Sequence, residues 1–424
     1  MRWTNLGVAL MATCFSVAVG DDTPPPVEKF LIEGRLADGA AAMQQLVEAN
    51  PTDHQAWFSL GVVQFFQAVE GLGQDQFRYG LLAGRARALP FMRLPIPENP
   101  APEEISYDKA KALLQKFITG LTQAEQTLSS VKADDVRLPL KLGQVRLDLN
   151  SDGKPVDEET MWYISQMLQN PRQTAVATSV VDFPVTFDAG DAVWLQGYCH
   201  VFSALGEIAL AHDWSDQFER TAHLFYPKVD SPYKFLEAEG TGAFMSFGAQ
   251  NIFDIVAWLH TINYEVAEPE RMQKALMHME TVIRLSRQSW TLIESETDDE
   301  NEWVPNVSQK SAMTGFTVGR EVVAGWREFL DELELILQGK KLVPFWRGIK
   351  GGVAPFERLP HNSKLGINVR KIFLEPTRFD LALWLQGTAL MPYLEEGDIS
   401  TPEKWQKMMV NFQGNFFNFA LWFN

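Results

Sequence analysis

The chain is poor in cysteine and in basic residues. Its 424 residues include two cysteines, and 37 Lys and Arg stand against 54 Asp and Glu, so the formal net charge is −17. Because the phosphates of nucleic acids require a basic surface, this excess of acid argues against a nucleic-acid partner. Cys14 lies in the N-terminal apolar stretch. Cys199 is then the one cysteine of the remaining chain, and we expect a buried, inert thiol with no disulfide partner.

Long apolar runs are also missing beyond the first residues. No run of about 18 uncharged apolar residues follows residue 20, which predicts no membrane span. The first residues have the pattern of a signal peptide: Arg2 is basic, residues 6–19 are apolar, and residues 18–20 form an Ala-Val-Gly cleavage site. We therefore expect a signal peptide at residues 1–20, cut after Gly20, and a periplasmic or secreted protein.

Sequence signatures of well-known catalytic sites are absent. The chain has no Walker loop, dinucleotide fingerprint, Gly-x-Ser-x-Gly elbow or cysteine-based metal motif. It also lacks the Glu-x-x-His and His-Glu-x-x-His spacings of helical metal sites. Nothing in the sequence therefore demands catalysis, and the question of enzymatic activity stays open.

The composition is that of a globular protein with many aromatic residues. Hydrophobic residues make up 46% and charged residues 21%, and there are 13 Trp and 28 Phe. Apolar side chains are used first for burial, so we assign most of these rings to packing between helices. The alternative is an aromatic pocket for a sugar or peptide, whose sign would be a concave surface formed by several of Trp57, Trp162, Trp194 and Trp258.

Apolar periodicity predicts an all-α, or nearly all-α, fold. The expected helical stretches are residues 27–85 in several pieces, 107–131, 188–213, 233–266, 269–294, 311–338, 378–395 and 401–412. Strands are expected only around residues 342–346 and 367–374. The acidic residues at 294–302 should form an exposed loop, and the aromatic tail at 412–423 should dock in the core.

Prolines recur between residues 86 and 106 and mark the best candidate for a domain boundary. We divide the chain after the signal peptide into residues 21–106, a helix with the loop motif described below at 107–170, and a helical domain at 171–424. These pieces can still share one core.

The first of these pieces contains a helix, a break and a second helix. Asn50 and Pro51 interrupt the apolar spacing, and a Trp-x-x-Leu-Gly string begins six residues after the proline, at Trp57. Residues 27–75 thus resemble the junction between two tetratricopeptide repeats. The resemblance implies a helical hairpin that stacks on the helices that follow, and no third copy occurs in the chain.

One motif has sharply defined chemistry. Residues 148–159 read Asp-Leu-Asn-Ser-Asp-Gly-Lys-Pro-Val-Asp-Glu-Glu. Asp148, Asn150 and Asp152 stand at positions one, three and five, a glycine stands at six, and Glu159 stands at twelve. The stretch therefore resembles the calcium loop of the EF-hand, which implies a bound Ca²⁺ held by these side chains. The alternative is a polar turn that caps the helix after it.

The remaining positions refine what this resemblance implies. Lys154 at position seven would offer its backbone carbonyl to the ion, and a water would serve at Val156. Residues 138–147 and 158–169 would be the flanking helices. Pro155 departs from the family pattern, because it has no N–H for the short β-bridge to a second loop, and no second loop occurs in the chain. We therefore predict a structural calcium clip.

Polar side chains at helical spacing are weaker candidates. One stripe holds Gln196, His200, Ser203 and Glu207, and a second holds Asn251, Asp254 and Thr261, with His260 nearby. Two facing stripes can build a metal or acid/base site around His200, Glu207 and Asp254. They can equally be hydrogen-bonded groups that fix the register of core helices, which is the interpretation we favour. The basic residues at 339–371 either meet the acidic bulk of the same protein, which we favour, or dock an anionic partner.

Three function classes follow. The first is an exported calcium-binding helical scaffold for a protein or peptide partner, which we favour. The second is a binding protein for sugars or other small molecules. The third is a metal-dependent hydrolase built on the polar stripes.

Overall fold

The computed structural model describes residues 25–423 with gaps. The residues left out within this range are 87–88, 90, 133–134, 170–179, 238–248, 313–317, 349–364, 413–415, 417–419 and 421–422. The predicted signal peptide with its cleavage site lies outside the described residues.

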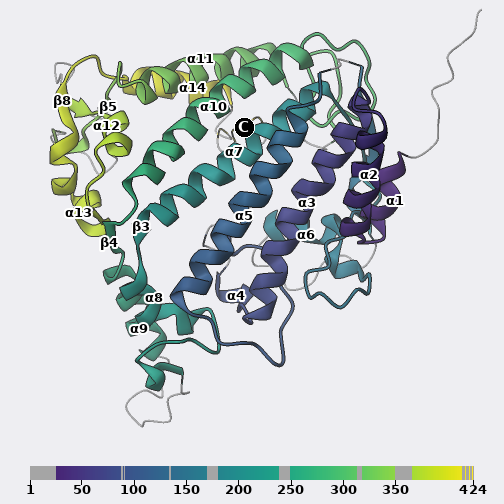
Figure 1. Ribbon diagram of the computed structural model, residues 1–424. Helices are drawn as coiled ribbons and strands as arrows, with labels where there is room; N and C mark the ends of the chain where they lie inside the picture. Colours follow the sequence, from purple (N-terminus) through teal and green to yellow (C-terminus); the bar gives the residue numbers. More distant parts are fainter. Residues whose placement is uncertain are drawn as a thin grey trace, which may run out of the picture.

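Long helices placed side by side form the body of the protein (Figure 1). In chain order these are α3 (His54–Arg78), α5 (Tyr107–Leu128), α7 (Ala189–Ala211) and α10 (Pro269–Ile293), and each packs on the next. On α3 lie α1 (Pro26–Ile32) and α2 (Leu36–Ala49), and beyond α10 lie α11 (Arg320–Leu337) and α14 (Pro402–Asn411). The mainly helical fold expected from the sequence is confirmed.

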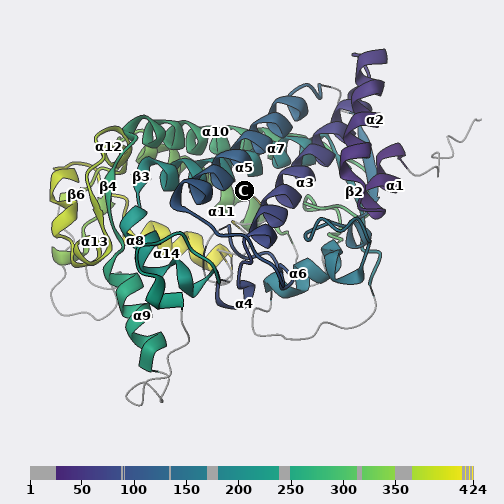
Figure 2. The same ribbon diagram turned by 60° about the horizontal axis from the view of Figure 1, so that its bottom comes forward.

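Shorter elements surround this body. The short helices are α4 (Ala83–Ala86), α6 (Met161–Gln169), α8 (Ser215–Thr221), α9 (Ala249–His260), α12 (Val369–Leu374) and α13 (Leu381–Gln386). Figure 2 shows α8 and α9 at one end of the helical layer, opposite α1 and α2. No helix among the described residues has the length and apolar character that crossing a membrane requires.

The strands form three small antiparallel sheets. β1 (Arg137–Lys141) pairs with β2 (Pro184–Asp188), so that Arg137 faces Asp188. The second sheet has the order β3 (His212–Asp213), β4 (Asn263–Val266), β7 (Phe379–Asp380), and the third has the order β5 (Val343–Pro344), β6 (Leu365–Ile367), β8 (Leu394–Glu396).

Side-chain caps mark the start of α3, α5 and α7. Asp53 accepts a hydrogen bond from the N–H of Ala56 at the start of α3, and Ser106 caps α5 in the same way. Asp188 accepts from two N–H groups at the start of α7, and Asp191 accepts from the N–H of Asp188, which completes a capping box.

The proline-rich segment does not divide the core. Leu81, Ile96 and Ile105 are buried in the same apolar cluster as Phe58 of α3 and Tyr226 after α8. Helices also approach closely where glycine allows it. A Cβ at Gly61 would lie 2.5 Å from a side-chain carbon of Leu128, so α3 and α5 could not pack as they do with any other residue at that position.

Three secondary-structure expectations are wrong. Residues 138–147 form β1 and a short 3-10 turn, because Leu138 and Leu140 alternate with exposed neighbours in a strand paired with β2. The helix expected at residues 233–266, in which three glycines already indicated a break, does not reach its expected end, since α9 stops at His260 and residues 263–266 form β4. The expected strand at 367–374 stops at Ile367, because the side chain of Asn368 caps α12.

The aromatic C-terminal tail docks in the core, as expected. Phe412, Phe416 and Phe423 are buried in a cluster with residues of α10 and α11. The ring of Phe423 makes edge-to-face contacts with Trp290 at 4.8 Å and Trp326 at 5.6 Å between ring centres. These three phenylalanines therefore complete the apolar cluster that they share with α10 and α11.

Removing this ring should destabilise the whole C-terminal half. Phe423 is 1% exposed and Phe235 is 73% exposed. We expect Phe423→Ala to lower the free energy of unfolding by about 3–5 kcal/mol, through lost burial and the cavity left behind. The matched change Phe235→Ala should have little effect. Urea unfolding followed by tryptophan fluorescence measures both, and equal effects would contradict a docked tail.

Candidate metal site

Residues 148–159 form a loop whose two ends are fixed together on the core. Arg146 and Thr160 form an antiparallel bridge, and the N–H of Leu147 donates to the carbonyl of Glu159 at 3.0 Å. Leu147 and Leu149 are fully buried. The helix expected before the loop is replaced by a strand and a turn, whereas α6 follows the loop within the range expected for the second flanking helix.

The side chains at positions one, three and five turn into the loop. Asp148 accepts from the N–H groups of Asp152 and Gly153, both at 3.1 Å. Asn150 accepts from the N–H of Asp152 at 2.9 Å, and Asp152 accepts from that of Lys154 at 2.8 Å. Gly153 has a φ of +66°, which glycine adopts without strain. The chain therefore makes a sharp turn at Gly153, position six of the loop.

Glu159 at position twelve is buried beneath this turn. Its side chain is 4% exposed, and one carboxylate oxygen accepts from the N–H of Leu149 at 3.1 Å. Burial, together with the negative charges of Asp148 and Asp152, raises the pKa of Glu159 to about 7. The carboxylate thus faces two others without a cationic side chain to balance it in the described part of the chain.

Glu70 of α3 is a fourth carboxylate at the loop, and the sequence analysis missed it. It accepts from the N–H of Asp148 at 2.8 Å, while Gln74, one turn further along α3, donates to the carbonyl of Asp148 at 2.9 Å. Burial, and then the charges of Asp148 and Glu159, raise the pKa of Glu70 to about 7. The available signal was that Glu70 is the only acidic or basic residue between His54 and Gln74 of an apolar helix.

The donor set of the loop fits calcium. Asp148, Asp152 and Glu159 provide carboxylates, Asn150 provides an amide oxygen and Lys154 a peptide carbonyl, so every candidate ligand is a hard oxygen. The oxygens of Asp148, Asp152 and Glu159 do not all lie within 4.8 Å of one another, since the one such group among the described residues is formed by other acids. The three loop carboxylates are therefore further apart than the ligands of one ion. Filling the site therefore requires the side chains to move inward.

The polar stripes do not form one site. Nδ1 of His200 lies 2.6 Å from Nδ1 of His278, and Nε2 of His200 lies 3.7 Å from Glu125. Asp254 lies 3.4 Å from His223 instead. The hydrolase hypothesis required His200 and Asp254 to converge with Glu207, and among the described residues each of the three has a different partner.

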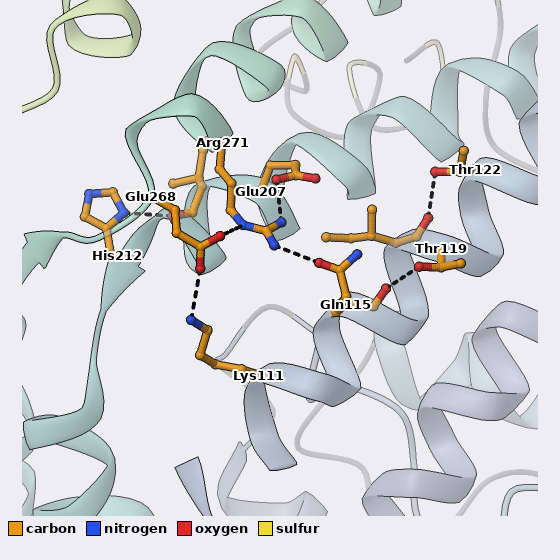
Figure 3. A network of polar contacts seen from close by, with 10 residues as sticks. Lys111, Gln115, Thr119, Thr122, Glu207, His212, Glu268 and Arg271 are labelled. Carbon is orange, nitrogen blue, oxygen red and sulfur yellow. Dashed lines mark hydrogen bonds and ion pairs between the residues drawn. The ribbon is translucent and has the colours of Figure 1, made fainter. Parts of the chain in front are cut away.

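Glu207 belongs to a network that joins three helices (Figure 3). Arg271 of α10 donates to Glu207 of α7 at 2.8 Å and to Gln115 of α5 at 2.9 Å. It also donates to Glu268 at 2.6 Å, and Glu268 in turn accepts from Lys111 at 3.1 Å. The stripe on α7 therefore fixes the register of the packed helices, which agrees with the structural interpretation.

The other weak candidates also have structural roles. Cys199 is 1% exposed, and burial raises the pKa of its thiol, so the expectation of an inert buried cysteine is confirmed. His212 lies 2.8 Å from the carbonyl of Ile208. Of the basic residues after 338, Lys341 pairs with Glu332 and Arg370 with Glu280, so these two meet acids of the same chain.

A cleft lies beside the loop, and an apolar cavity lies among the helices. A cleft of about 1150 Å³ is lined by residues of the loop, including Asn150 and Glu159, together with residues 80–85 and 95–100. An apolar cavity of about 470 Å³ lies among α3, α5, α7, α8 and α9. Of the four tryptophans named as possible pocket walls, only Trp258 lines this cavity, where its neighbours include other aromatic rings.

The comparisons with known proteins add no relative. No protein-family model, no curated protein and no solved structure matches the chain. What the protein does is therefore inferred from its own residues.

Proposed function

We propose that the protein is an exported, calcium-binding helical scaffold, in which one Ca²⁺ at residues 148–159 fastens the loop and α6 to the helical body. The observation that carries the proposal is the meeting of buried Glu70 and Glu159 with Asp148, in a loop that has the residue order of a calcium site. Carboxylates so placed repel one another, and a divalent cation relieves that repulsion.

The chain supplies both the ligands and their support. Asp148, Asn150, Asp152 and Glu159 would hold the ion through side chains, and Lys154 through its carbonyl. When bound, the ion supplies the positive charge that Asp148, Asp152 and Glu159 do not receive from an ion pair among the described residues. Gln74 anchors the start of the loop on α3. Asp157, near the end of the loop, forms an ion pair with Arg146 at 3.1 Å. Two polar contacts from outside the ligand set therefore support the loop.

A partner-binding role rests on the cleft beside the loop. Because Asn150, Glu158 and Glu159 line it, calcium would shape one of its walls. The cleft is large enough for a peptide segment. The helices packed in chain order give a stiff support for such a surface, and a weak site suffices for a structural ion outside the cytoplasm, where calcium is plentiful.

A second candidate function is the binding of an apolar small molecule. The cavity of about 470 Å³ supports it, since its lining combines aromatic rings such as Trp214 and Trp258 with two convergent polar groups. These are Gln217 and Tyr264, which are joined by a hydrogen bond of 2.5 Å. A ligand with one polar end and an apolar body fits this arrangement.

Removing a loop ligand should remove one calcium ion. We expect Asp148→Ala and Glu159→Ala each to bind one calcium fewer than the unaltered mature chain in isothermal titration calorimetry. Calcium should also raise the melting temperature of the unaltered chain more than that of either variant. The neighbouring change Glu158→Ala is the control, since that side chain is exposed. Unchanged stoichiometry in both ligand variants at millimolar calcium would refute the site.

The acidic groups at the loop also predict a pH effect in the calcium-free protein. The folded-state pKa values of Glu70 and Glu159 are raised to about 7. The folded chain therefore binds more protons than the unfolded chain between the usual glutamate pKa and about 7, so stability falls as pH rises through this window. Thermal unfolding in a chelator at several pH values measures the slope.

Glu70→Gln should flatten that slope, because the amide keeps the shape of the side chain but does not titrate. Glu48→Gln, a change at an exposed glutamate of α2, should leave the slope as it is. A slope that Glu70→Gln does not reduce would contradict the assignment of the effect to the loop.

A further inference from the structure

A second group of carboxylates meets where α7 begins. Asp188, Glu296 and Glu302 each place one oxygen within 4.8 Å of the others. Asp191, three residues after Asp188 in the first turn of α7, adds a fourth carboxylate, whose charge acts on the first two and on Glu302. The residues of this cluster lie at the N-terminus of α7 and in the acidic stretch that follows α10.

Two of these carboxylates are almost completely buried. Asp191 is 4% exposed and Glu302 is 3% exposed. One oxygen of Asp191 and one of Glu296 are buried without any hydrogen-bond partner. Because a buried carboxylate oxygen loses its water, an oxygen left without a donor is costly and points to a ligand that completes it.

The donors that do reach the cluster are neutral. Asp188 accepts from the N–H of Gly190 at 2.7 Å, and Asp191 accepts from the N–H of Asp188 at 3.2 Å. Glu302 accepts from a backbone N–H at 2.7 Å, and Glu296 from the side-chain amide of Gln309 at 3.2 Å. In the described part of the chain no lysine or arginine forms an ion pair with any of the four.

Arg137 forms ion pairs with Asp298 and Glu300, which are exposed residues of the same acidic stretch. Its charge also acts on Glu302, without an ion pair between the two. The four carboxylates therefore gather without an ion-paired cation among the described residues, although burial makes their mutual repulsion stronger than on the surface.

The acidic stretch is held firmly in place. Glu302 forms bridges to Thr186 of β2 and to Ser311. The side chain of Asn306 donates to the carbonyls of Ile293 and Glu296 at 3.0 and 3.2 Å. The prediction of an exposed loop at 294–302 is therefore wrong for Glu302, and Glu296 is half-buried.

Aromatic residues neighbour the cluster in the chain, and Gly190 lies against two of its carboxylate oxygens. The ring of Trp303 contacts Phe187 and Trp194, which flank the start of α7. A Cβ at Gly190 would come within 3.1 Å of an oxygen of Glu296 and 3.2 Å of an oxygen of Asp188. Glycine thus allows both oxygens to turn toward the same space.

We propose that Asp188, Glu296 and Glu302, completed by Asp191, bind a hard divalent cation of the size of calcium or manganese. All donors are carboxylate oxygens, as such cations prefer, and oxygens up to 4.8 Å apart can share an ion with ligand distances of about 2.4 Å. The ion would fasten residues 294–302 to the N-terminus of α7. This site is independent of residues 148–159, since none of its ligands comes from that loop.

A shared proton is the competing explanation. Burial and the charge of Asp188 raise the pKa of Glu296 to about 9, so a protonated Glu296 can donate to Asp188. One shared proton relieves the repulsion between Glu296 and Asp188, but the buried oxygen of Asp191 still has no hydrogen-bond partner. The experiment must therefore separate a bound cation from a bound proton.

The test uses the mature chain carrying Glu159→Ala, which removes the proposed ion at residues 148–159. Titration calorimetry with calcium chloride, and manganese paramagnetic resonance, should find one ion per chain. Adding E296Q and E302Q together should abolish it, because amides keep the shape but lose the charge. D299N, at an exposed acid of the same stretch, should keep the ion.

Asp191→Asn gives an independent check, since its amide oxygen can still accept from the N–H of Asp188. We expect it to weaken cation affinity by about 10-fold or more. Binding of no ion by the Glu159→Ala chain at millimolar calcium or manganese would overturn the proposal and leave the shared proton. So would an ion that survives E296Q and E302Q, because it would lie elsewhere.

Discussion

Mutual repulsion between carboxylates is the constraint that sets two peripheral segments of this protein apart from its apolar body. Apolar packing holds the row α3, α5, α7 and α10 together, and the tail adds to it at α10 and α11. At two other joins, acidic side chains converge instead. Glu70 of α3 meets the loop at residues 148–159, and Asp188 at the start of α7 meets residues 294–302.

The chain treats other buried carboxylates differently. Glu332 of α11 is fully buried, and burial alone would raise its pKa. Hydrogen bonds from Lys404, Ser400 and Lys341 instead hold the pKa of Glu332 below its ordinary value. Glu207 likewise receives Arg271. Glu332 and Glu207 thus have basic partners, whereas the carboxylates that converge at the two acidic joins have no ion-paired cation among the described residues. The proposed cations would account for this difference.

Local patterns allowed much of the helical fold to be predicted. The apolar stripes of α5, α7 and α10 each lie within one continuous segment of sequence. Asp188, directly before the apolar segment of α7, is a residue type that favours a helix N-cap. The ligand order at residues 148–159 is equally local. The strand β1 was missed because its two buried leucines are too few for a clear alternation, and its partner β2 lies more than forty residues away.

The missed site residues depend on contacts that no local spacing reveals. Glu70 reaches the loop from α3, and Glu302 reaches Asp188 only because a bridge holds it beside β2. The hypothesis of a joint site around His200 and Asp254 was wrong for the opposite reason. Their spacing suggested convergence, but side chains from other elements, His278 and His223, lie against them first. A periodic pattern gives the face of a helix and leaves the identity of its neighbour open.

Calcium binding at residues 148–159 is tested most directly by an anomalous difference map from a crystal of residues 21–424 grown with calcium. The account predicts a peak at residues 148–159, with oxygens of Asp148, Asp152 and Glu159 at about 2.3–2.6 Å from it. A well-ordered loop with no peak there, and with Glu70 and Glu159 placed as in the calcium-free chain, would contradict the account.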